Sequence, residues 1–222
     1  MPISQPQSVY TVSMGLSNAY LVVGADGLML VDAGAPGFER AVLRRMSALG
    51  RDDLRLIFIT HAHLDHYGSA AALRRLTGAA IAIHRADGDA MARGETPLGS
   101  TRGWGGMVRI LMPLIEQVLR PEPTPADVYL DDGDDVQRFG GSGTLLHTPG
   151  HTPGSSCLIL GDVAFVGDLL STTGPPRLQR YFASDWSALP KALARLQERQ
   201  PRRVYTAHGR YPLRGEQLAR LR

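Results

Sequence analysis

The chain has 222 residues, of which 43% are hydrophobic and 20% charged, as in an ordinary globular protein with one substantial core. No apolar run approaches the roughly 18 to 20 residues of a membrane span, and the first residues do not resemble a signal peptide, so we expect a cytoplasmic protein with no membrane partner. The net charge of +3 comes from scattered arginines, which form no contiguous basic tract, and we expect no nucleic-acid partner.

The first part of the chain alternates strands and helices. Short apolar runs predict strands at 9–12, 19–23, 28–31, 54–59 and 80–83. Helical spacing of apolar residues predicts helices at 38–49 and 69–76. This alternation favours an α/β layered domain.

A distinctive segment follows at about 94–126. Its glycine-rich beginning precedes the apolar stretch 107–120, which predicts a helix bent or begun at Pro113. This helix has more apolar residues than one buried face requires. We interpret the segment either as a core or dimer contact or as a lid and wall of a substrate pocket. The residues proposed for that wall are Trp104, Leu111 and Ile115.

The second part of the chain returns to short strands separated by glycine-containing turns. Strands are expected at 128–130, 136–139, 144–147, 156–160, 163–166 and 204–206. Helices are expected at 185–199 and 215–221. No Pro/Ser/Gly-rich linker divides the chain, so we expect one domain over residues 1–222 with the 94–126 segment inserted in it.

Histidine and aspartate residues gather directly after the predicted strand at 54–59. Three imidazoles and a carboxylate lie within six residues there, namely His61, His63, Asp65 and His66. Further candidates stand near the ends of other strands at His151, Asp168 and His208. Imidazole nitrogen and carboxylate oxygen bind Zn²⁺, Mn²⁺ or Fe²⁺, so the pattern predicts a metal site. The alternative, that these residues merely cap a strand, does not explain three clustered histidines.

These motifs occur in a fixed order along the chain. His-x-His-x-Asp-His is followed by Thr-Pro-Gly-His-Thr-Pro-Gly, Gly-Asp and Ala-His-Gly, and with Asp32 they span most of the sequence. The combination resembles the metallo-β-lactamase superfamily. The resemblance implies a four-layer αββα sandwich, in which two mixed β-sheets are flanked by helices, with the ligand loops along one edge.

The resemblance also implies a dinuclear centre with two divalent ions, most readily Zn²⁺, although iron or manganese also fits. One ion would be held by His61, His63 and His151, the other by Asp65, His66 and His208, with Asp168 bridging both. The ions would generate hydroxide at neutral pH. Asp65 is the expected catalytic group for the leaving group's proton. Asp32 and His147 are expected to contact the ligands from outside.

The substrate is a small molecule whose identity the motifs restrict only in part. Asp168 stands where true β-lactamases of the superfamily usually have cysteine or serine, as in glyoxalase II-like thioesterases and lactonases. Ser171 stands where quorum-quenching lactonases tend to have tyrosine. The nearby Arg177 and Tyr181 complete the expected pocket.

We therefore expect hydrolysis of a small ester, thioester or lactone. The alternatives are a persulfide dioxygenase with one iron, a phosphodiesterase or a β-lactamase, and a homodimer is possible.

Overall fold

The computed structural model describes residues 8–24, 26–139 and 143–222. Its larger sheet has six strands, in the spatial order β1 (Ser8–Ser13), β2 (Asn18–Val23), β3 (Leu28–Val31), β4 (Leu54–Ile59), β5 (Ala80–His84) and β7 (Val128–Leu130). The first three strands are antiparallel, whereas β3, β4, β5 and β7 run parallel to one another. The sheet is therefore mixed.

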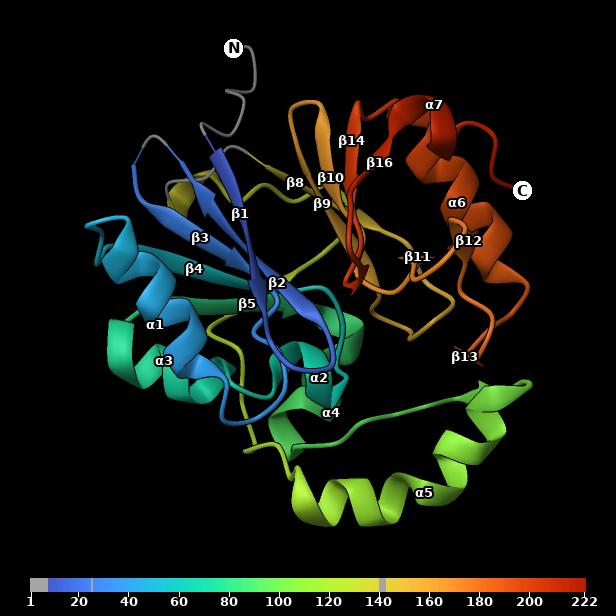
Figure 1. Ribbon diagram of the computed structural model, residues 1–222, viewed down its shortest axis with the longest axis horizontal. Coiled ribbons are helices and arrows are strands. Elements are labelled where there is room, and N and C mark those ends of the chain that lie inside the picture. Colours follow the sequence, from blue (N-terminus) through green and yellow to red (C-terminus); the bar gives the residue numbers. More distant parts are fainter. Residues whose placement is uncertain (1–7, 25, 140–142) are drawn as a thin grey trace.

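The second sheet has five strands, in the order β16 (Leu213–Arg214), β14 (Arg203–Tyr205), β10 (Val163–Phe165), β9 (Ser156–Leu160) and β8 (Thr144–His147). Only β10 and β14 are parallel, so this sheet is mixed as well. The two sheets face each other, and helices cover their outer faces (Figure 1). The outer helices are α1 (Glu39–Ala48) and α3 (Ala70–Thr77) on the first sheet and α6 (Ala188–Glu198) and α7 (Gly215–Leu218) on the second. The predicted αββα sandwich is confirmed.

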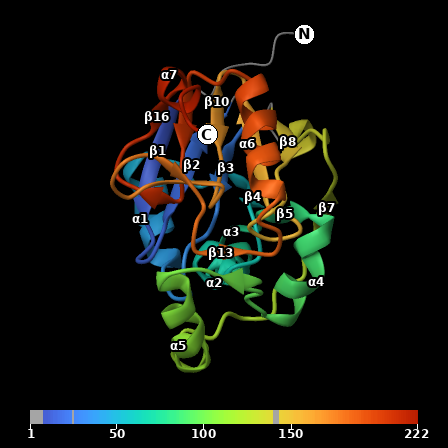
Figure 2. The ribbon, with the colours of Figure 1, turned by 90° about the vertical axis from the view of Figure 1, so that its right-hand side faces the viewer.

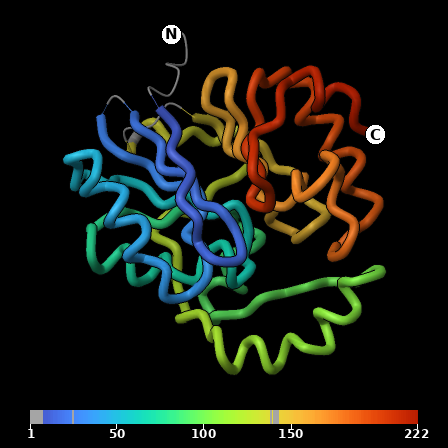
Figure 3. The backbone as a smooth tube through the Cα atoms, viewed as in Figure 1, coloured from blue at the N-terminus to red at the C-terminus, as the bar shows by residue number. Residues whose placement is uncertain are grey.

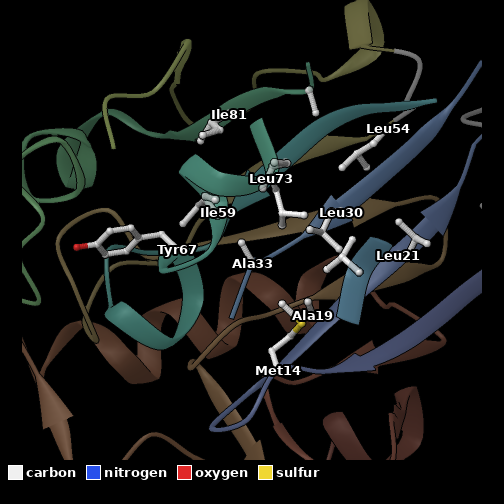
Figure 4. Packing of buried hydrophobic residues seen from close by; sticks show 14 of the residues in the cluster. Met14, Ala19, Leu21, Leu30, Ala33, Leu54, Ile59, Tyr67, Leu73 and Ile81 are labelled. Carbon is white, nitrogen blue, oxygen red and sulfur yellow. The ribbon is translucent and has the colours of Figure 1, made fainter. Parts of the chain in front are cut away.

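The strand sequences explain why both faces of each sheet are covered. In β4, Leu56 and Phe58 belong to the core between the sheets, whereas Ile57 and Ile59 belong to the core beneath the helices. Because successive strand residues point to opposite faces, an uninterrupted apolar run is buried on both sides. Figure 4 shows the helix-side core, where Leu73 of α3 packs against the strands.

Helix α4 (Arg85–Arg93) precedes the segment expected as an insertion at 94–126, which contains β6 (Ser100–Thr101) and α5 (Trp104–Val118). Strand β6 pairs with β13 (Phe182–Ala183), which ties the start of α5 to the second half of the chain. Figure 3 shows the green part of the chain running along the margin of the molecule. Among the described residues, no helix is long and apolar enough to cross a membrane.

Two sequence-based expectations were wrong in detail. The expected strand at 136–139 contains a 3₁₀ helix, Gln137–Phe139. The carboxylate of Asp135 accepts a hydrogen bond from the Gln137 N–H at 3.0 Å, and this local bond turns the backbone away from an extended path. In addition, of the two alternatives for Pro113, a bend or a helix start, the start is wrong, because α5 already begins at Trp104 and continues through the proline.

Replacing Phe58 with alanine should strongly destabilise the fold, because this fully buried ring fills the space between the two sheets. We expect a loss of about 3 to 5 kcal/mol in the free energy of unfolding. Urea denaturation measures this change. Leu76→Ala, at a helical position that is 60% exposed, is the control and should change stability by less than about 0.5 kcal/mol.

Candidate metal centre

The predicted ligands meet at one edge of the sandwich, where strands from both sheets end. His61 and His63 follow β4, Asp65 and His66 lie in the short helix α2 (Leu64–Tyr67), and His151 lies between β8 and β9. Asp168 follows β10, and His208 begins β15 (His208–Gly209) shortly after β14. Each loop leaves a rigid strand at the same edge, and all seven side chains therefore converge.

Three of the imidazoles form a buried triad. The Nε2 atom of His151 lies 3.2 Å from Nε2 of His61 and 3.1 Å from Nδ1 of His63. All three residues are no more than 5% exposed. Their inward nitrogens are close enough to one another to share a single metal ion.

Hydrogen bonds on the far side of each ring determine which nitrogen carries the proton. His151 Nδ1 lies 3.0 Å from the carbonyl of Phe182, and His63 Nε2 lies 2.9 Å from the carbonyl of Pro97. A carbonyl only accepts, so these nitrogens must donate, and the opposite nitrogens present lone pairs towards each other. Such facing lone pairs repel unless a cation lies between them. The triad therefore fits a metal ion.

His61 is oriented through a neighbouring hydroxyl. Thr60 Oγ1 lies 3.0 Å from both carboxylate oxygens of Asp32 and donates its proton there, so it accepts from Nδ1 of His61 at 3.1 Å. The Nε2 lone pair of His61 then faces the triad as well. Burial lowers the pKa of all three triad histidines, that of His151 to about 3, which keeps the rings neutral, as metal ligands must be.

A second triad consists of Asp65, His66 and His208. Oδ2 of Asp65 lies 3.7 Å from Nε2 of His66 and 3.4 Å from Nε2 of His208. These three residues also present one ligand atom each within a metal-sized space. Unlike the first triad, this one contains a carboxylate.

Asp168 reaches both triads. Its Oδ1 lies 3.4 Å from Nε2 of His66 and 3.2 Å from Nε2 of His208, while its Oδ2 lies 3.5 Å from Nε2 of His151. In the described part of the chain, Oδ1 of Asp168 and Nε2 of His66 are buried without a hydrogen-bond partner. Such orphaned atoms are rare in folded proteins and are the ones a bound cation would satisfy.

The electrostatics of the second triad also favour a cation. Burial alone would raise the pKa of Asp168, but the nearby His208 and His66 outweigh it and hold this pKa well below the usual range. Conversely, the Asp168 carboxylate raises the pKa of His208 to about 9. Burial would lower the pKa of His66, yet Asp65, Asp32 and Asp168 together raise it well above its usual value. The pocket attracts positive charge.

Asp32 and His147, the two residues expected to contact the ligands, differ in whether they reach a ligand side chain. Asp32 adopts a left-handed backbone (φ 59°), and its carboxylate accepts hydrogen bonds from the Thr60 N–H at 2.8 Å and from Nδ1 of His66 at 2.9 Å. His147 instead stacks on His84 at 3.9 Å, and its Nε2 donates to the carbonyl of Pro153. Within the described residues, His147 thus touches the backbone of the His151 loop but no ligand side chain.

Asp87 is a residue that the motif analysis missed. It lies in the first turn of α4 and is 1% exposed. Its carboxylate accepts hydrogen bonds from the Ala62 N–H at 2.9 Å, the Gly154 N–H at 2.6 Å and the Thr152 hydroxyl at 2.7 Å. A Cβ atom at Gly154 would come within 2.6 Å of the carboxylate carbon, so glycine is required for this approach. Asp87 joins the two loops that carry the first triad.

A cavity of about 330 Å³ opens beside Asp168 and His208. Three of the predicted pocket residues, Trp104, Arg177 and Tyr181, line it. The start of α5 is held there because the Arg102 N–H donates to the carbonyl of Tyr181 at 3.0 Å.

Two further predicted pocket residues lie elsewhere. Leu111 and Ile115 do not line this cavity. They are two and three turns further along α5, and each helical turn moves a side chain about 5.4 Å along the axis.

A larger hollow of about 880 Å³, between β1 and β14, contains none of the candidate ligands.

An αββα sandwich with a histidine triad and an Asp/His triad at one sheet edge defines a metal-dependent hydrolase class. The chain belongs to the metallo-β-lactamase superfamily, whose family model matches residues 13–208. The two ligand clusters are consistent with a dinuclear metal site.

Two enzymes are similar to this chain in sequence. The acyl-coenzyme A thioesterase MBLAC2 of Bos taurus is 28% identical over 186 residues, which cover 74% of this chain and 64% of that protein. A hydroxyacylglutathione hydrolase of Cereibacter sphaeroides is 32% identical over 137 residues, 60% of this chain and 41% of that protein. The chain thus spans less than two thirds of either relative.

Among solved structures, TTHA1623 in a di-iron-bound form is 28% identical, with a TM-score of 0.71 and coverage of 96% of this chain and 97% of that one. The BLEG-1 B3 metallo-β-lactamase has a TM-score of 0.73 with 95% coverage of both chains, but at 22% identity it supports the fold alone.

Replacing Asp87 with alanine should weaken metal binding by about 10- to 100-fold, because the loops of the first triad lose their common anchor. Isothermal titration of the apoprotein with Zn²⁺ measures the affinity, and circular dichroism checks folding. Asp87→Asn keeps one of the two acceptor oxygens and should be affected less than Asp87→Ala. Asp89→Ala, an exposed neighbour on the same helix, is the control. Unchanged zinc affinity in folded Asp87→Ala would contradict this role.

Proposed function

We propose that this protein is a dinuclear metal hydrolase of small acyl thioesters, with zinc as the expected metal. The observation that carries the proposal is the pair of triads bridged by Asp168, next to a cavity lined by Asp168 and His208 themselves. A substrate in that cavity would lie directly against the metal ligands.

When bound, two divalent ions polarise a carbonyl group and lower the pKa of a water molecule from about 15.7 towards about 7. The chain's own residues position the metal-binding atoms and supply a group for proton transfer. The triads hold the ligand nitrogens towards the centre, and Asp32 restrains the ring of His66. Asp65, whose side chain is 19% exposed and lies 3.4 Å from Nε2 of the cavity residue His208, is the proposed group for the leaving group's proton.

The lining of the cavity favours a thioester over an ordinary ester or a lactone. A thiol leaving group has a pKa of about 8.5 and departs with little proton assistance, whereas an alkoxide requires a strong proton donor. Among the described residues that line the cavity there is no lysine, and the only carboxylate is the ligand Asp168. The names of the thioesterase and hydroxyacylglutathione hydrolase relatives support the same substrate class.

Two arginines give the cavity a cationic rim. Arg177 donates to the carbonyl of Thr173 at 2.9 Å, and Arg180 contacts Tyr181. In the described part of the chain, neither guanidinium has a carboxylate within ion-pair distance. Both charges are therefore free to attract an anionic group on the thiol carrier, such as a phosphate or a carboxylate.

Elemental analysis of the purified protein, combined with thioester assays, tests this function. We expect close to two metal ions per chain, hydrolysis of acyl-coenzyme A or acylglutathione, and loss of activity on chelation. Asp168→Ala should lose metal and reduce kcat/KM by at least about 100-fold, because both triads lose their shared carboxylate.

The exposed Asp52→Ala is the matched control and should retain both metal and activity. Circular dichroism separates metal loss from unfolding. Folded Asp168→Ala with two metal ions and full activity would refute the assigned centre. One iron per chain with O₂ consumption on a persulfide would replace the hydrolase by the dioxygenase alternative.

Trp104→Ala tests the proposed pocket wall. Loss of the indole should raise KM for thioesters with apolar acyl groups by about tenfold, equivalent to about 1.4 kcal/mol of binding, with unchanged metal content. Steady-state kinetics over an acyl-chain series measures this effect. Met107→Ala is the control, because Met107 shares the exposed face of α5 but does not line the cavity. Identical kinetics for both variants would remove Trp104 from the pocket.

A further inference from the structure

Helix α5 exposes an unusual number of large apolar side chains. They are 47% to 80% exposed, with Ile110 at 80% and Val118 at 74%. The complete set is Trp104, Met107, Ile110, Leu111, Leu114 and Val118. Figures 1 and 2 both show α5 as the outermost element at one end of the molecule. Only Gly105 and Met112 of this helix are buried, so the chain's own core does not account for the apolar face.

The spacing of these residues is specific for helix pairing. Five of them follow one another at intervals of three, four, three and four residues, namely Trp104, Met107, Leu111, Leu114 and Val118. This is the a/d repeat that places one continuous seam along a helix and packs it against a second helix. No charged residue interrupts the seam. A helix that lay free in water would not need this pattern.

The area of the face is sufficient for a specific interface. The six side chains expose on the order of 700 Å², above the roughly 300 to 600 Å² of the largest patch on a typical monomer. It is also close to the roughly 800 Å² per partner of a standard protein interface.

A membrane surface or a substrate chain fits the face less well than another helix. Helices that lie on membranes carry many Lys and Arg residues on their polar face, whereas α5 has Arg109 and Glu116 as its only charges. Arg109 also donates to the carbonyl of Gly99 at 2.9 Å. Of the six exposed side chains, only Trp104 lines the cavity, so an acyl chain bound there would leave most of the seam uncovered.

We infer that α5 is the interface between two copies of this chain, which pair their α5 helices antiparallel about a two-fold axis near Leu111. Leu111 is the midpoint of the seam, so the axis brings this residue against its own copy. The same axis places the bulky Trp104 opposite the smaller Val118 of the second copy, which makes the seam self-complementary. The second copy then lies beside the mouth of the cavity. This inference does not depend on the proposed reaction.

Sedimentation velocity across a wide dilution series tests the pairing. The wild-type protein should sediment at twice the chain mass of 24.0 kDa, and Leu111→Glu should shift it to the monomer mass. Leu76→Glu, at another exposed helical leucine, is the matched control and should remain a dimer. Circular dichroism confirms that each variant is folded.

A cysteine variant tests the position of the axis. The native Cys157 is buried, so Leu111→Cys introduces an accessible thiol that should form a disulfide-linked dimer on mild oxidation, whereas Leu76→Cys should not. A monomeric wild-type protein at all concentrations would overturn the inference. A dimer unaffected by Leu111→Glu would overturn it as well. Monomers that co-sediment with anionic phospholipid vesicles through α5 would replace the second copy by a lipid surface.

Discussion

The arrangement of the site depends on one electrostatic constraint, the convergence of buried lone pairs and carboxylates at the edge of two sheets. His151 and His63 turn lone pairs towards each other because backbone carbonyls hold the protons on their opposite nitrogens. Asp168 adds a carboxylate between the two triads. A protein interior tolerates such an assembly only when a cation compensates it. The surrounding loops are shaped to keep these groups together.

Contacts between the two halves of the sandwich maintain that convergence. The Ser156 N–H donates to the carbonyl of Thr60 at 3.0 Å, which joins the loop before His61 to the strand after His151. Asp87 provides a second connection from α4 to both loops. Asp32 provides a third, within the larger sheet. The candidate ligands follow different strands, but these hydrogen bonds hold their loops together as one unit, which pre-organises the site for metal.

Helix α4 and the inserted segment at 94–126 lie next to the metal centre and are the parts of the chain on which the proposals depend. Helix α4 supplies Asp87, the pairing of β6 with β13 positions the cavity wall, and α5 carries an apolar seam away from the core. Substrate recognition and self-association are thus proposed for neighbouring parts of one insertion. The metal centre lies within residues 13–208, which the superfamily model matches.

The sequence by itself predicted an α/β layered domain and a metal site near His61, because apolar periodicity and clustered His/Asp residues are local signals. The αββα sandwich and the complete ligand set were expected from the resemblance of the motifs to the superfamily. Strand β4 and the metal-binding loop around His61 were predicted from such local signals. Asp87 was not, although an acid just after β5 was a usable signal, because its partners lie on two distant loops. The turn at Gln137–Phe139 and the pairing of β6 with β13 likewise depend on particular contacts. Only the tertiary structure showed that Trp104 lines the cavity and Leu111 does not. The direction in which α5 leaves the cavity is determined by long-range packing, which periodicity does not encode.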